Sequence, residues 1–190
     1  MPFTDPRVKI LDQPNIAPLT KLIREMQGRT LRVPFADPND GGIYAKTLFL
    51  METPGPQAVQ SGFVSCDNPD PAALNMKTSL DHAGFERNDY VLWNVVPQCI
   101  STKDQNRSAS AGQIKAAAPD TQAFISRLER LMVIVFCGRQ AQRAIRYLNI
   151  PNGIEMLMTF HTGAKAYNHL HMRDHIHRTF RLARRLIEKA

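Results

Sequence analysis

The sequence predicts a single α/β domain over residues 1–190, in which helices cover both faces of a central, mainly parallel four-stranded sheet. Short apolar runs alternate with amphipathic segments along the chain, which is typical of a three-layer α/β/α fold. The chain has 190 residues, of which 43% are hydrophobic and 22% charged, so it is long enough and apolar enough for one full core. One folded domain is therefore expected.

Four continuous apolar runs are the predicted strands. An apolar run of about five residues without polar alternation is typical of a strand that is buried on both faces. The runs are Thr47–Met51, Tyr90–Asn94, Met132–Phe136 and Met156–Phe160.

The first helices are predicted from amphipathic spacing and from their end residues. One runs from about Ala17 to Met26. Another begins at Pro71, with Asp70 as its N-cap, and ends near Gly84. Proline suits the first turn of a helix, and glycine suits the position just after its end.

A loop and two more helices are predicted in the second half of the chain. The polar stretch Ser101–Ala118 is expected to be a mobile loop. The next helix is expected over Thr121–Leu131 with Asp120 as its N-cap, and another over Gln140–Leu148.

The last predicted helix, Met172–Lys189, carries much of the positive charge. Its core-facing residues are expected to be Phe180, Leu182, Leu186 and Ile187. The net charge of +7 favours a polyanionic partner, because cationic surfaces displace counterions from phosphates. A solvated helix face explains the same charge about as well.

Several classes of protein are disfavoured by the sequence. No apolar stretch approaches the length that crosses a bilayer, so no membrane contact and a cytoplasmic location are expected. Cys66, Cys99 and Cys137 are widely spaced and form no C-x-x-C pair, so free and mostly buried thiols are expected rather than disulfides or a zinc site. The histidines within 169–177 lack a carboxylate pair or cysteine to complete a metal site, and no metal or cofactor is predicted.

Polar side chains stand at the ends of the predicted strands. Glu52 follows the first strand, Asn94 ends the second, and His161 follows the fourth. The carboxyl ends of parallel strands share one edge of the sheet, so these groups are expected to converge there. A carboxylate, an amide and an imidazole without a phosphate-binding glycine loop suit hydrolysis of a small organic group.

The motifs at these strand ends resemble the ordered motif set of the uracil-DNA glycosylase superfamily, over about residues 33–170. Each motif is weak alone, but together they occur in the right order. They are Leu48–Pro56 (LFLMETPGP), Ser61–Pro69 (SGFVSCDNP), Leu92–Pro97 (LWNVVP), Val135–Ala141 (VFCGRQA) and Thr159–Gly163 (TFHTG).

The resemblance implies catalytic and base-binding roles. Glu52 matches the carboxylate that orients the attacking water in the iron-sulphur branch, whereas the best-known branch has it at the position of Thr53. His161 matches the histidine that stabilises negative charge on the departing base. Phe63 matches the aromatic residue on which the base stacks, and Asn94 the amide that reads its edge.

The resemblance also implies binding residues around this centre. Pro54 and Gly55 belong to the first motif and are expected to line the substrate site with Thr53. Gly163 is expected to do the same, although the superfamily usually has Pro-Ser after the histidine. DNA contacts, including a side chain that wedges into the base stack, are expected from Lys165, Tyr167 and Leu170.

Together these features predict a monomeric, monofunctional uracil-DNA glycosylase that binds uracil-containing DNA, releases free uracil and starts base excision repair. The iron-sulphur branch needs four cysteines, and only Cys99 falls near a ligand position, so no cluster is expected. Two alternatives stay open. One is a uracil- or DNA-binding relative with weak or absent catalysis, and the other is an unrelated α/β hydrolase that acts on nucleosides or small amides.

Overall fold

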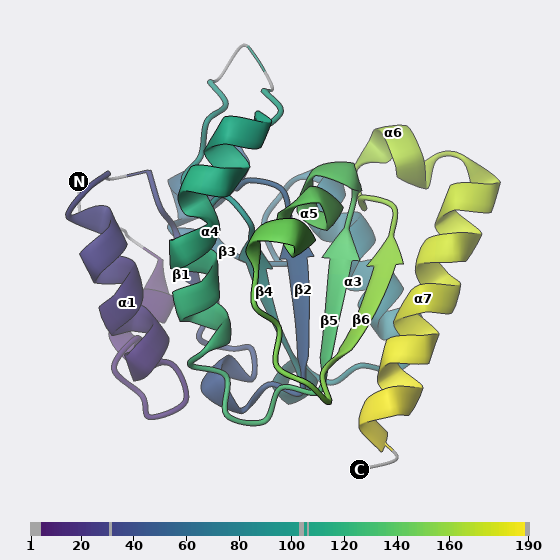
Figure 1. Cartoon of the computed structure of the whole chain (residues 1–190), viewed down its shortest axis with the longest axis horizontal. Coiled ribbons are helices and arrows are strands. Elements are labelled where there is room, and N and C mark those ends of the chain that lie inside the picture. Colours follow the sequence, from purple (N-terminus) through teal and green to yellow (C-terminus); the bar gives the residue numbers. More distant parts are fainter. Residues whose placement is uncertain (1–4, 31, 103–104, 106, 189–190) are drawn as a thin grey trace.

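The centre of the molecule is a parallel β-sheet. The computed structural model describes residues 5–30, 32–102, 105 and 107–188. The strand order is β4-β2-β5-β6, and every neighbouring pair is parallel. The predicted α/β class with a four-stranded parallel sheet is confirmed (Figure 1). The strands are β2 (Thr47–Met51), β4 (Tyr90–Asn94), β5 (Val133–Cys137) and β6 (Glu155–Thr159).

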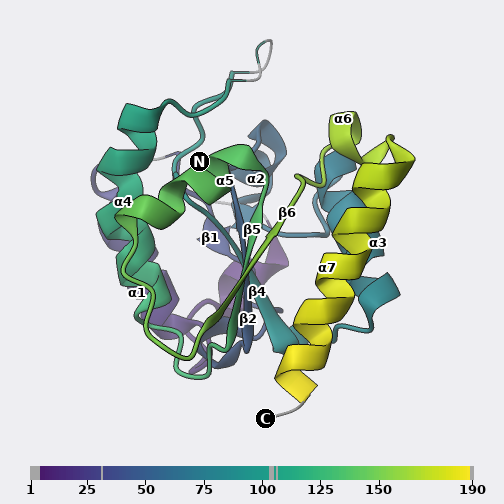
Figure 2. The same cartoon turned by 45° about the vertical axis from the view of Figure 1, so that its right-hand side comes forward.

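Helices cover both faces of the sheet (Figure 2). On one face α5 (Arg139–Ala144) packs against β2 and β5, α4 (Ala111–Ile125) lies beside α5, and α1 (Ala17–Gln27) packs against α4. On the other face α7 (Leu170–Glu188) packs against β5 and β6. On the same side, α3 (Pro71–Ala83) packs against α7. Two short helices, α2 (Pro56–Ser61) and α6 (Ala164–Tyr167), and a parallel pair of β1 (Phe35–Ala36) with β3 (Phe63–Val64) complete the regular elements. There are 3-10 turns at Pro6–Ile10, Gly42–Tyr44, Arg87–Asp89 and Ile145–Tyr147.

Aromatic contacts join the layers. Trp93 of β4 stacks on Phe124 of α4 with ring centroids 4.3 Å apart. Across the other face, Phe49 of β2 lies 4.6 Å from Phe180 of α7, measured between ring centroids. All four rings are buried, so each helix layer is fixed to the sheet by large apolar surfaces.

The α3 helix has the ends that its sequence predicts. The Asp70 side chain accepts hydrogen bonds of 3.0 Å from the backbone N–H groups of Ala72 and Ala73. Gly84 follows the last turn in a left-handed conformation, with φ of +77°. A residue with a side chain is strained in that conformation, which accounts for glycine there.

The predicted boundaries of α4 were wrong. The helix begins at Ala111, not near residue 121, so the second half of the predicted loop is helical. Its N-cap is Ser110, whose side chain accepts from the Gln113 N–H while the Gln113 side chain accepts from the Ser110 N–H. Asp120 lies inside this helix, so its predicted role as N-cap was wrong, and Pro119 beside it is also inside the helix.

The β6 strand and the helices around it also correct the predictions. The predicted strand was displaced by one residue, and β6 is not buried on both faces, because Met156 is 44% and Met158 54% exposed at this edge of the sheet. Apolar character alone did not distinguish an edge strand from a central one. The predicted helix over 140–148 ends as α-helix at residue 144 and continues as a 3-10 turn.

The C-terminal helix buries a slightly different face from the one predicted. Phe180 and Ile187 are buried and Leu186 packs against the core, as expected. Leu182 is 40% exposed, so its predicted core position was wrong. Ala183 takes the buried position beside it. None of the helices in the described part of the chain is long and apolar enough to cross a membrane.

Buried ion pairs fix the segment before β4 to the N-terminal region. The Arg87 guanidinium lies 3.0 Å from an Asp37 carboxylate oxygen and 2.9 Å from one of Asp40. Arg7 contacts the same Asp37 oxygen at 2.6 Å. Both aspartate side chains are fully buried, and burial raises the pKa of Asp40 well above its usual value.

Candidate functional site

The polar groups that follow the strands lie at the carboxyl edge of the sheet. The chain continues in register beyond β4, because the Val95 N–H donates to the Met51 carbonyl at 2.9 Å and the Val96 N–H to the Glu52 carbonyl at 3.0 Å. This pairing fixes the backbone of Glu52 next to the segment that follows Asn94. Two of the predicted site residues are therefore brought together by the sheet itself.

The Glu52 carboxylate is held by the loop that precedes α4. Its Oε1 atom accepts hydrogen bonds of 2.6 Å from both the Ala109 N–H and the Ser108 hydroxyl. Ser108 Oγ in turn accepts from Gln140 Nε2 at 3.0 Å, and Gln140 Oε1 accepts from Arg143 at 2.9 Å. Within the described residues these bonds reach Oε1 alone, so Oε2 of the half-buried carboxylate is free to bind a water molecule.

The His161 ring is held in one tautomer. The Gly163 N–H donates to His161 Nδ1 at 2.8 Å, so Nδ1 carries no proton and the proton of the neutral ring is on Nε2. Burial lowers the pKa of His161, although the carboxylates of Glu52 and Asp70 oppose this shift. At neutral pH the side chain is thus an uncharged imidazole with one N–H available as a donor.

Two glycines allow other groups to approach this histidine. A Cβ on Gly163 would lie 2.9 Å from His161 Nδ1. A Cβ on Gly138, which has a φ of +92°, would lie 3.0 Å from His161 Cβ. Thr162-Gly163 stands where the resemblance has Pro-Ser, and the Gly163 N–H approaches the ring closely.

The loop that carries His161 is fastened to α3. Asn75 Nδ2 donates to the Thr162 carbonyl at 2.7 Å, and the buried Thr162 hydroxyl donates to the Ala72 carbonyl at 3.1 Å. This places the N-terminus of α3 near the histidine, and the Asp70 carboxylate that caps it acts to raise the pKa of His161.

Asn94 presents an unused donor. Its side chain is 1% exposed, and no described residue accepts a hydrogen bond from its buried Nδ2 atom. An unsatisfied buried amide costs about 1–3 kcal/mol, so an acceptor from a ligand would recover free energy there.

Phe63 is placed differently from a freely accessible stacking platform. It is fully buried in β3, with its ring 6.2 Å from that of Phe35. The Arg7 guanidinium lies over the ring, 4.4 Å from its centroid. A base can stack on that face only if Arg7 moves away.

The rest of the first motif forms the turn into α2. Thr53 is partly buried and Pro54 is buried, whereas Gly55 is exposed and is the N-cap of α2. A Cβ on Gly55 would meet no atom within 4 Å, so the backbone here borders open space.

The three residues predicted to contact DNA are in different environments. Lys165 in α6 is exposed, and Leu170 at the start of α7 is 63% exposed. Tyr167 is buried, with its hydroxyl 3.0 Å from His177 Nε2 and 3.3 Å from Ser79 Oγ. Of the two proposed wedges, Leu170 is presented to solvent and Tyr167 is packed inside.

A sequence profile of the uracil DNA glycosylase superfamily matches residues 38–183. The chain belongs to this superfamily. Members of the superfamily are DNA glycosylases and bind DNA. Among solved structures, a mimivirus UNG variant in complex with UGI is similar, with 13% sequence identity, a TM-score of 0.42, and coverage of 86% of this chain and 72% of that chain. No curated protein sequence matches.

Within this superfamily framework, the cysteines are as the sequence indicated. Cys66, Cys99 and Cys137 are free and buried. Cys99 lies 3.3 Å from an Arg32 nitrogen, measured from its Sγ atom. The described residues contain no group of three or more potential metal ligands.

Sequence reasoning missed the residues that support the superfamily motifs. Ser108 donates to the Glu52 carboxylate, Gln140 donates to Ser108, and Asn75 holds the histidine loop. These residues lie far from their partners in sequence. The Ser110–Gln113 capping box was a usable signal, because it fixes the start of α4 and hence the position of Ser108 just before it.

Proposed function

We propose that this superfamily member hydrolyses the N-glycosidic bond of deoxyuridine in DNA, leaving an abasic site and free uracil. The observation that carries the proposal is the pairing of a Glu52 carboxylate with a neutral His161 on the same edge of the sheet. The two are close enough for the Glu52 charge to oppose the lowering of the histidine pKa.

This pair suits the charges that develop during the reaction. Cleavage builds positive charge on the deoxyribose and negative charge on the base, as in other glycoside hydrolyses. The Glu52 carboxylate stabilises the sugar cation and orients water through Oε2. The Nε2–H of His161 donates to uracil O2 as negative charge accumulates there, which is worth about 3 kcal/mol for a preorganised donor.

Base recognition is assigned to Asn94. Its Nδ2 group donates to uracil O4, which satisfies the buried donor that the protein leaves unpaired, and its Oδ1 atom accepts from N3–H. Cytosine offers the opposite pattern at these two atoms, so the same amide rejects it. Thr53, Pro54, Gly55 and Gly163 line this site.

The protein is proposed to act as a monomer on extruded uracil in DNA. Leu170 is the exposed apolar side chain that fills the gap left by the base, and Lys165 contacts phosphate. The net charge of +7 supports binding to the strand. Stacking on Phe63 remains a prediction that requires displacement of Arg7.

A second candidate is a uracil- or DNA-binding member with weak catalysis. The observation that favours it is the Arg7 guanidinium over Phe63, which covers the ring that the resemblance assigns to base stacking. Such a protein would bind uracil-containing DNA without forming an abasic product.

The test is release of uracil from a labelled oligonucleotide with a single uracil, followed by alkali cleavage. Wild type should produce abasic sites, and Glu52→Gln and His161→Ala should each lose about two to three orders of magnitude in rate. Glu129→Gln and His82→Ala are matched controls, because both residues are exposed, Glu129 ahead of β5 and His82 in the last turn of α3. Binding without product would favour the second candidate, and activity on free deoxyuridine alone would indicate a nucleoside hydrolase.

A further inference from the structure

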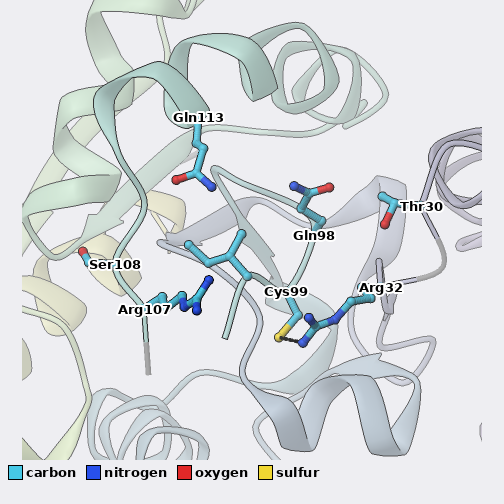
Figure 3. Close-up of a pocket in the computed structure, with 8 residues that line it drawn as sticks. Thr30, Arg32, Gln98, Cys99, Arg107, Ser108 and Gln113 are labelled. Atoms are coloured by element: carbon cyan, nitrogen blue, oxygen red, sulfur yellow. Dashed lines mark hydrogen bonds between the residues drawn. The ribbon is translucent and has the colours of Figure 1, made fainter. Parts of the chain in front are cut away.

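A cavity of about 480 Å³ lies beside the proposed active site. Its walls come from the segment between α1 and β1, from the chain after β4, and from the start of α4. Figure 3 shows Arg32, Arg107 and Gln113 around the same open space. We propose that this cavity binds a phosphodiester group of the DNA strand next to the extruded nucleotide, an inference that rests on the proposed function.

The charge of the cavity favours an anion. Arg32 and Arg107 both line it, and no described lining residue is an aspartate or glutamate. Their hydrogen bonds go to neutral acceptors: Arg32 to Cys99 Sγ and the Ser101 carbonyl, and Arg107 Nε to Gln105 Oε1 at 3.1 Å.

Neither guanidinium forms an ion pair within the described part of the chain. Two uncompensated guanidinium groups on one cavity match the planar, multidentate binding that arginine gives to phosphate.

The remaining walls suit a sugar-phosphate group. Gln98 and Gln113 add polar groups to the wall, and Gln113 lies in the first turn of α4, whereas the Ser108 hydroxyl already donates its proton to Glu52. The positive end of that 15-residue helix, which has no acidic residue in its first turn, strengthens the potential for an anion. The volume exceeds that of a bare phosphate ion and leaves room for the attached sugar.

Ser108 sets the distance between this cavity and the reacting sugar. It lines the cavity, and its hydroxyl donates to Glu52 Oε1 at 2.6 Å. Only the Ser108 side chain therefore separates a phosphate in the cavity from the Glu52 carboxylate, which is assigned to the sugar. This places it on a linkage adjacent to the flipped deoxyuridine rather than at a distant point on the strand.

The proposal is tested by neutralising phosphates one at a time. Oligonucleotides carrying 2′-fluorinated deoxyuridine, which resists cleavage, are made with a single methylphosphonate at each linkage near the uracil. Binding is measured by fluorescence anisotropy for wild type, Arg107→Ala, Arg32→Lys and Arg130→Ala. Arg130 is a matched control, because it is an exposed arginine just before β5, at the amino ends of the strands and away from the cavity.

For wild type and Arg130→Ala, one linkage beside the uracil should weaken binding about tenfold when neutralised. For Arg107→Ala that penalty should shrink to less than about twofold, and the slope of log K against log salt should flatten by about one. Arg32→Lys should keep the charge but lose part of the penalty, because lysine cannot bind in a bidentate manner.

Three results would overturn the proposal: equal penalties in Arg107→Ala and wild type at every linkage, no DNA binding by wild type, or saturation of the cavity by inorganic phosphate without competition against DNA. The outcome is separable from that of the proposed function. If uracil is released but Arg107→Ala keeps the full methylphosphonate penalty, only the cavity assignment is overturned. If Arg107→Ala loses that penalty but the wild type releases no uracil, only the glycosylase assignment is overturned.

Discussion

The backbone N–H of Gly163 donates to Nδ1 of His161 at 2.8 Å, in a space where a Cβ on Gly163 would lie 2.9 Å from the same nitrogen. The ring is fixed as the Nε2–H tautomer because the glycine backbone reaches it directly.

Replacing Gly163 by alanine should displace the His161 ring. We expect kcat for uracil release to fall by about 10- to 100-fold, because small misplacements of a catalytic group carry penalties of that order. The backbone φ of −61° accepts alanine, so the thermal midpoint should change little. Gly112→Ala is the control, since its new Cβ would make only an ordinary 3.8 Å contact. An unchanged kcat in Gly163→Ala would show that a side chain at this position does not displace the His161 ring.

The pH dependence of activity should follow a histidine whose pKa is lowered by burial. The reaction needs neutral His161, so kcat should be constant above about pH 6.5 and should decline only below this ordinary histidine value. A decline that begins above pH 6.5 would contradict the neutral-imidazole role.

Stability should respond to the same titration. Between the lowered folded pKa and the unfolded value, the unfolded chain binds more protons, so the free energy of unfolding should fall as the pH falls through this window. The pKa of His177 is also lowered by burial, so urea unfolding of His161→Ala must be compared with wild type at each pH. The variant should lose part of the pH dependence, and identical curves would count against the assignment.

Removing the Ser108 hydroxyl should affect catalysis more than folding. Ser108→Ala leaves Glu52 Oε1 with only the Ala109 N–H among the donors described, and we expect kcat to fall about tenfold with little change in KM for the uracil-containing oligonucleotide. Ser126→Ala removes a comparable hydroxyl bond at the far end of α4 and should leave kcat unchanged. Equal rates in the two variants would show that Ser108 does not position Glu52.

The Arg87 ion pairs should matter for stability and not for chemistry. Arg87→Ala leaves Asp40 buried beside Asp37, with Arg7 as the remaining ion-pair partner among the described residues, and should lower the free energy of unfolding by about 3–5 kcal/mol. Urea denaturation gives this value directly. Arg185→Ala, on an exposed part of α7, should change it by less than about 0.5 kcal/mol.

The sequence indicated the sheet well because its signal is local. The runs at β2 and β4 coincide with the observed strands, and the Asp70 and Gly84 signals mark the ends of α3. The predictions failed where tertiary context decides. The interior of α4 accommodates Pro119. Met158 is apolar yet exposed, because β6 is an edge strand.

The candidate site was predictable in part for the same reason. Strand ends bring Glu52 and Asn94 to one edge, which parallel topology requires. The support from Ser108 to Glu52 spans 56 positions of sequence, and that from Asn75 to Thr162 spans 87. No local pattern encodes such contacts, because they depend on how loops pack after the sheet has formed.

The contact of Arg7 with Phe63 has a consequence for comparisons between relatives. The superfamily match begins at residue 38, so Arg7 lies outside the shared region, whereas Phe63 lies inside it. The face of the Phe63 ring that Arg7 covers is therefore controlled by a segment that the match does not include. Under the proposed stacking of the base on Phe63, exchange of the segment that carries Arg7 between members should therefore alter base selectivity, even when every motif residue is kept.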